Sequence, residues 1–60
     1  MKIKFNFTKN GKVIKTFETL QEAMDMLRRV AANDISNDIL EVQKVKDNNV
    51  VSYYDLMGKL

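Results

Sequence analysis

The stretch that most constrains the fold of this chain covers residues 19–33. It opens with Thr19 and carries Glu22 three residues later, which is the capping-box pattern of a helix N-terminus. It closes with Asn33, a residue that tolerates the left-handed backbone conformation of a helix stop. At about 100° per residue, its apolar side chains share one wide stripe: Leu20, Ala23, Met24, Met26, Leu27, Val30 and Ala31. The sequence therefore predicts one amphipathic helix, which must bury this stripe against a second element.

The segment before this helix has the pattern of a β-hairpin. Residues 2–8 alternate polar and apolar side chains, with the period of two that is expected for a half-buried strand. Asn10 and Gly11 follow, and both tolerate the positive φ that a tight hairpin turn requires. Residues 13–17 are then expected to return as the second strand.

Two registers are open for this hairpin. A two-residue turn places Phe7 opposite Ile14, whereas a three-residue turn with a bulge at Gly11 places Phe7 opposite Val13. We prefer the three-residue turn, because it gathers five apolar residues on the face toward the helix: Ile3, Phe5, Phe7, Val13 and Phe17. Ile14 then lies on the open face of the sheet.

The second half of the chain predicts a loop and another hairpin. Residues 33–39 are rich in short polar side chains and are expected to form the loop. Residues 40–46 and 50–54 are expected to pair around a turn at Asp47 and Asn48. The side toward the helix is then expected to carry Leu40, Val42, Val51 and Tyr53, and the outward side Glu41, Gln43, Val45, Val50, Ser52 and Tyr54. In the tail, the spacing of the apolar residues suits one helical turn.

The predicted order of elements is β-β-α-β-β, in a single small α+β domain over residues 1–60. A right-handed crossover through the helix favours a four-stranded mixed sheet of order 2-1-4-3, with the first and fourth strands parallel at its centre. Through Asn10-Gly11-Lys12 at the turn, and Thr19 with Glu22-Ala23 at the helix start, it resembles the β-grasp topology of streptococcal immunoglobulin-binding domains. No tryptophan matches the central binding aromatic of that family, so the resemblance implies the architecture and no activity.

Composition argues against several classes of function. The sequence has no cysteine and no histidine, so it can form no disulfide and lacks both the usual zinc ligands and the usual general base. We therefore expect no enzyme, no metal site and no cofactor. A chain of sixty residues has only a small core, which favours close packing or a partner subunit.

One segment matches part of a calcium-loop pattern. Asp34, Ser36 and Asp38 occupy the first, third and fifth positions of such a loop. Ile39 stands at the sixth position, where glycine is required, and Val45 at the twelfth, where a bidentate glutamate is required. An Asx-rich turn is therefore the better interpretation.

The basic residues are unevenly distributed, although the formal net charge is only +2. Residues 1–16 contain no acid and five of the ten basic residues: Lys2, Lys4, Lys9, Lys12 and Lys15. Such a hairpin can neutralise phosphates, which makes nucleic-acid binding the second hypothesis. Against it, no aromatic residues alternate with these lysines to stack bases, and lysines on edge strands also prevent edge-to-edge pairing.

Contact with another protein is the hypothesis that the sequence favours. The candidate site consists of apolar residues expected on the open face and in the tail: Ile14, Val45, Val50, Tyr54, Leu56, Met57 and Leu60. A homodimer through the open face or an edge strand would relieve the small core. The alternative that the tail folds back over the sheet as core stays open.

We therefore predict a non-enzymatic protein-binding module. Its size and its richness in Lys, Asn and Ile suggest a modulator or inhibitor of a host protein, encoded by a phage or another mobile element. The sequence shows no signal-peptide pattern and no apolar run near the roughly 20 residues of a membrane span. These absences, with the lack of cysteine, favour a cytoplasmic location without membrane contact.

Overall fold

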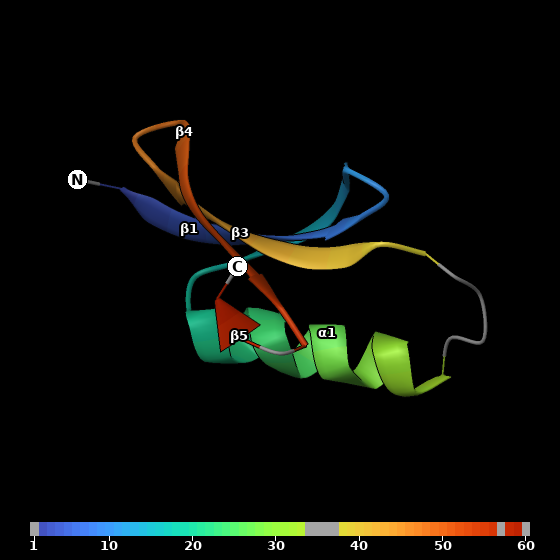
Figure 1. The fold of residues 1–60 in the computed structure, drawn as a ribbon. Helices are drawn as coiled ribbons and strands as arrows, with labels where there is room; N and C mark the ends of the chain where they lie inside the picture. The colour runs from blue at the N-terminus through green and yellow to red at the C-terminus, as the bar shows by residue number, and fades with distance from the viewer. Residues whose placement is uncertain (1, 34–37, 57, 60) are drawn as a thin grey trace.

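The computed structural model describes residues 2–33, 38–56 and 58–59, which contain one helix and five strands (Figure 1). In chain order these are β1 (Ile3–Lys9), β2 (Lys12–Phe17), α1 (Leu20–Asn33), β3 (Leu40–Lys46), β4 (Asn49–Asp55) and β5 (Gly58–Lys59). The strands form one curved sheet, and α1 lies against one of its faces (Figure 1). The predicted α+β class, with one helix on a sheet, is confirmed. We call the uncovered side the open face.

The sheet has the order β2-β1-β3-β4-β5, and every neighbouring pair is antiparallel. The predicted order 2-1-4-3 is therefore wrong, and so are the mixed sheet and the β-grasp-like topology. β3 takes the place beside β1 that was expected for β4, and it pairs along the full length of β1. Helix α1 thus connects two parallel strands, β2 and β3, that flank β1. The crossover passes over one strand instead of two, which is the shorter connection.

Both hairpins close through two-residue turns. In the first turn, φ is 54° at Asn10 and 83° at Gly11, and in the second it is 50° at Asp47 and 69° at Asn48. Positive φ at both central residues matches the right-handed twist of the flanking strands. The predicted position of the second turn is therefore confirmed.

The register of the first hairpin depends on a bulge in β2. Lys9 pairs directly with Lys12, so the preferred three-residue turn is wrong. The register then shifts between Phe7 and Thr8, which leaves one extra residue in β2. Because of this shift, Phe17 still packs against the core, as predicted.

The same bulge places two apolar residues of β2 in solvent. Val13 lies opposite Thr8 and is 47% exposed, so its predicted place toward the helix is wrong. Ile14 follows at the bulge and is exposed, as predicted. The two-residue turn and the bulge together place Phe17 against the core and leave Val13 in solvent. Neither of the two predicted registers contains this combination.

A second bulge reverses the predicted facing of β4. The register of the β3–β4 pair shifts between Lys44 and Val45. Beyond this shift, Tyr54 lies opposite the buried Val42 and packs against the core. The predicted facing of Tyr54 is therefore wrong, since Tyr53 is the tyrosine on the open face.

The core lies between α1 and the facing side of the sheet, where β1 and β3 supply the buried strand residues. Its buried side chains are Phe5, Phe7, Ala23, Met24, Leu27 and Val42. Partly buried hydrophobic residues surround them: Phe17, Leu20, Met26, Val30, Leu40 and Tyr54. The apolar stripe of the helix is thus used for packing, as predicted.

Local side-chain contacts fix the helix ends. The Thr19 hydroxyl accepts a hydrogen bond from the Glu22 backbone N–H at 3.2 Å and donates one to Glu22 Oε1 at 2.8 Å. The predicted start is therefore confirmed. Asn33 is the last residue of α1, but it is not among the residues with positive φ, so the predicted left-handed stop is wrong. On the outer face, Arg28 pairs with Asp25 at 3.2 Å.

Candidate functional site

The open face carries a polar row that crosses four strands. Thr16, Asn6, Gln43 and Tyr53 are successive cross-strand partners, and such partners lie on the same face of a sheet. The Thr16 hydroxyl donates a hydrogen bond to Asn6 Oδ1 at 2.7 Å. Asn6 is buried although no helix covers it, because neighbours on both sides flank it. The centre of the open face is therefore polar.

An apolar cluster borders this row on β3 and β4. Val45 pairs with Val50, Val51 follows at the bulge, and Tyr53 comes two residues later. The side chains of Val50, Val51 and Tyr53 are 42%, 52% and 43% exposed, whereas Val45 is buried. We call these four residues the β4 patch. Adjacent exposed apolar side chains of this size often mark an interaction surface.

The structure brings together two of the residues predicted for protein binding, Val45 and Val50. Ile14 is exposed on β2, but β1 and β3 separate that strand from β4. Tyr54 packs on the helix side of the sheet, so its assignment to an open-face site is wrong. The predicted site is thus divided between at least three parts of the molecule.

The tail does not form the predicted helical turn. It folds back as the short strand β5, which pairs with the end of β4 through Asp55 and Gly58. Leu56 lies in the turn between these strands and is exposed. Met57 and Leu60, the other two predicted contact residues of the tail, lie outside the described residues.

Tyr53 and Val51 are the surface residues that sequence reasoning assigned to the core. Two signals for them are present in the sequence. Val50 and Val51 are consecutive apolar residues, which break the period-two alternation and are compatible with a bulge. Tyr53 and Tyr54 are adjacent in one strand, so one of them must face away from the core.

The five lysines of the first hairpin do not form one basic surface. Lys4 is exposed on the open face, whereas Lys9 and Lys15 lie on the helix side. Lys9 Nζ pairs with an Asp38 carboxylate oxygen at 3.2 Å, and Lys15 Nζ lies 5.2 Å from the centroid of the Phe17 ring. The remaining two are exposed at opposite ends of the hairpin: Lys2 and Lys12.

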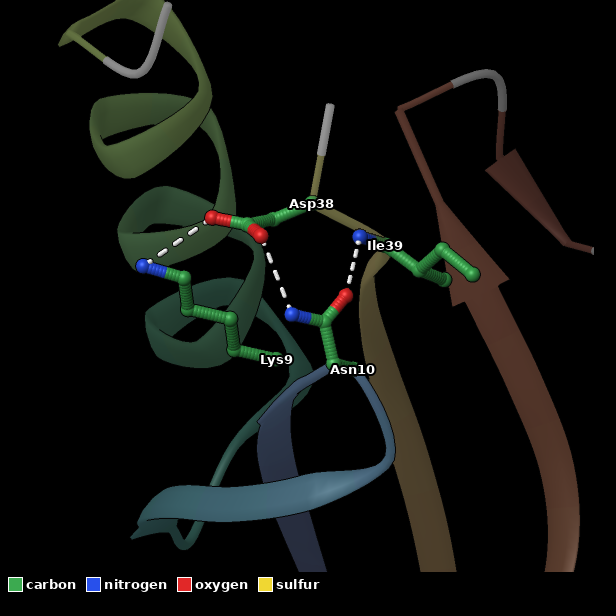
Figure 2. Close-up of polar contacts among 4 residues, drawn as sticks. All are labelled: Lys9, Asn10, Asp38 and Ile39. Carbon is green, nitrogen blue, oxygen red and sulfur yellow. Dashed lines mark hydrogen bonds and ion pairs between the residues drawn. The ribbon is translucent and has the colours of Figure 1, made fainter. Parts of the chain in front are cut away.

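A polar cluster joins the first turn to the segment that enters β3 (Figure 2). Asn10 Oδ1 accepts a hydrogen bond from Ile39 N at 2.9 Å, and Asn10 Nδ2 donates one to Asp38 Oδ1 at 3.0 Å. The second carboxylate oxygen of Asp38 faces Lys9 (Figure 2). These contacts connect residues far apart in the sequence, and we assign them a structural role.

The described residues contain no group of three or more His, Cys, Asp or Glu side chains placed to hold a metal ion. In the partial calcium-loop pattern, Asp34 and Ser36 lie outside the described residues, and Asp38 contacts Lys9 and Asn10. In the same part of the chain, no helix has both the length and the apolar character needed to cross a membrane.

Comparisons of the chain with models of known protein families, with curated proteins and with solved structures found no match. The function is therefore argued from the geometry of the surface.

Proposed function

We propose that this protein is a small non-enzymatic binding module whose partner is another protein that docks on the β4 patch. The observation that carries the proposal is the adjacency of three exposed apolar residues on β4: Val50, Val51 and Tyr53. Tyrosine at the edge of an apolar cluster is a frequent anchor of protein interfaces, since it adds a large ring and a hydroxyl.

The surface area of the molecule shows how large a part of it a stable interface would cover. A stable interface of standard size buries about 800 Å² on each partner. The total accessible surface here is 4416 Å², so such an interface covers nearly a fifth of it. The β4 patch alone is too small for this area. The partner must therefore also cover the neighbouring polar row, where Gln43 and Thr16 offer hydrogen-bonding groups.

The proposal includes a biological setting. The small size and the Lys-, Asn- and Ile-rich composition support a cytoplasmic modulator or inhibitor of a host protein, encoded by a phage or another mobile element. A homodimer through the open face is a competing use of the same patch. Sedimentation over a dilution series separates the two, because a dimer dissociates on dilution and a monomer does not change.

Site-specific photo-crosslinking tests the proposal. A benzophenone amino acid at position 53 is expected to capture a defined partner in lysate of the source cell, while the same group at position 21, on the outer face of α1, is not. With the captured partner purified, Tyr53→Ala is expected to weaken binding about tenfold or more. Val50→Asp should weaken it similarly, whereas Val13→Asp, an equally exposed position on β2, should not.

The second hypothesis, nucleic-acid binding, predicts a different result. DNA or RNA would be retained with a steep negative dependence on salt, and Lys4→Glu together with Lys15→Glu would abolish retention. That outcome would overturn the proposed function. The division of the lysines between two faces of the sheet favours the protein partner.

A further inference from the structure

A second surface lies on the other side of the sheet, where β2 meets α1. A groove between these elements has a half-buried apolar floor made by Phe17, Met26 and Val30. Four exposed charged residues also line it: Lys15 of β2 and Glu22, Asp25 and Arg29 of α1. We call these seven residues the β2–α1 groove. The three floor residues pack against the core on one side, and their other side is open to a ligand.

The two cations of the groove are not neutralised by its acids. Asp25 pairs with Arg28 at 3.2 Å, on the outer face of the helix. Glu22 accepts a hydrogen bond from the Thr19 hydroxyl, which holds its carboxylate at the N-terminal end of α1. Within the part of the chain that the structure describes, neither Arg29 nor Lys15 has a carboxylate partner, and the Lys15 ammonium lies over the Phe17 ring. The groove therefore carries two cations without an ion-pair partner, beside an apolar floor and the Glu22 carboxylate.

The backbone of β2 adds a third binding element. β2 is an edge strand, so its outer side has no neighbouring strand among the described residues. Such an edge presents unpaired N–H and C=O groups to an incoming chain. The bulge at Ile14 interrupts the strand near the turn, but residues 15–17 pair regularly with β1. The regular part of the edge is thus the part that lies beside the groove.

We propose that an extended segment of another protein adds to the sheet along residues 15–17 of β2, with acidic and apolar residues sharing the face of the segment that points into the groove. Strand addition lets main-chain hydrogen bonds supply affinity and lets every second side chain enter the groove. There, apolar side chains pack against Met26 and Val30, and carboxylates bind Lys15 and Arg29 through charge-assisted hydrogen bonds.

Charge selects this occupant over a second copy of the chain. β2 carries two lysines and no acid, so pairing of β2 with itself brings like charges together. An acidic segment meets the complementary charge instead. The groove and the β4 patch lie on opposite faces of the sheet, so this inference is independent of the proposed function.

Selection from a displayed library of random peptides, with the full chain immobilised as the target, tests the inference. We expect selected peptides to carry Asp or Glu and apolar residues at positions two apart, so that both kinds share one face of the strand. Labelled copies of them should lose affinity on the order of tenfold for Lys15→Glu/Arg29→Glu, in fluorescence anisotropy. They should keep their affinity for Lys4→Glu/Lys46→Glu, which makes the same change in net charge away from the groove.

Backbone pairing has its own readout, which the charge variants do not affect. In a β-ladder only every second N–H of the peptide faces its neighbour. Methylation of alternate backbone nitrogens in one phase is therefore expected to abolish binding, and methylation in the other phase to preserve it. Amide chemical shifts of the protein should move at residues 12–17 and on the facing side of α1.

Four results would overturn the inference. The selection can return no peptide that binds above background, or peptides without acidic residues. The two methylation phases can behave alike. The shifts can instead map to residues 45–53, which would support a contact at the β4 patch and exclude the β2–α1 groove as the site.

Discussion

Asn10 and Ile39 are joined by two hydrogen bonds that continue the pairing of β1 with β3 past the ends of both strands. Asn10 N donates to Ile39 O at 2.7 Å, and Ile39 N donates to Asn10 Oδ1 at 2.9 Å. The opposite end of the pair has the same arrangement, since Asp47 N donates to Lys2 O at 3.0 Å and Lys2 N donates to Asp47 Oδ1 at 3.1 Å. The first turn residue of each hairpin therefore binds the other hairpin.

Two substitutions at Asn10 separate the side-chain contacts from the backbone conformation. Asn10→Gly keeps the positive φ of the turn but removes the bonds to Ile39 N and Asp38, so we expect a loss of about 1 kcal/mol of unfolding free energy. Asn10→Ala removes the same bonds and adds a further cost of roughly 1 kcal/mol for a left-handed alanine. Urea unfolding of the two variants measures the difference. Equal stability of both would contradict the left-handed turn.

The local parts of this fold could be predicted from the sequence, whereas the sheet order could not. The start of the helix depends on Thr19 and Glu22, and the second turn on Asp47 and Asn48, so each involves only residues that are close in the sequence. The order of the strands depends on contacts such as Asn10 with Ile39, between residues 29 positions apart. The general preference for a right-handed crossover does not determine which strand lies beside β1, because that choice depends on such long-range contacts.

The helix cap provides a prediction for stability. The Thr19 hydroxyl satisfies the Glu22 backbone N–H, which otherwise has no partner within the helix. We expect Thr19→Ala to lower the unfolding free energy by about 1 kcal/mol. Thr19→Ser keeps the hydroxyl and should change stability by only a few tenths of that amount. Thermal unfolding followed by circular dichroism measures both, and a serine variant as unstable as the alanine variant would show that the cap is not the cause.

The adjacent tyrosines of β4 test which side chain faces the core. Tyr54 packs against the core opposite Val42, so we expect Tyr54→Ala to cost about 2 kcal/mol. Tyr53 is 43% exposed on the open face, and Tyr53→Ala should stay within about 0.5 kcal/mol of the parent. For partner binding we expect the reverse order: Tyr53→Ala should weaken binding more than Tyr54→Ala. A reversed order of stability would place Tyr53 in the core and remove the β4 patch.

The candidate site was predictable only in part, because two bulges decide which side chains are exposed. The alternation in β3 placed Val45 outward, and the structure confirms this. In β4, the register shift beside Val45 exchanges the faces of Tyr53 and Tyr54. Neither of the two bulges in the described strands contains a glycine, so the usual marker residue of a bulge is missing at both positions. A single extra residue is enough to reverse the facing of every side chain beyond it.

Engineered cysteines can distinguish the observed sheet order from the β-grasp order, because the chain has no cysteine of its own. Ile3 lies opposite Lys46 on β3, and Asn49 on β4 lies opposite the same lysine on its other side. The Cα atoms of neighbouring strands lie about 5 Å apart, within the reach of a disulfide, whereas those two strands apart are separated by about 10 Å. Ile3→Cys/Lys46→Cys should therefore form an intramolecular disulfide under mild oxidation.

The control pair is Ile3→Cys/Asn49→Cys, which the observed order places too far apart to oxidise without distortion. In the order 2-1-4-3, β1 and β4 are parallel neighbours whose first residues lie side by side, so this control pair would form the disulfide instead. Mass spectrometry of the oxidised monomers, with and without a reductant, reports which pair has closed. Closure of the first pair alone supports the antiparallel contact of β1 with β3, and closure of the control pair alone would replace it with the β-grasp arrangement.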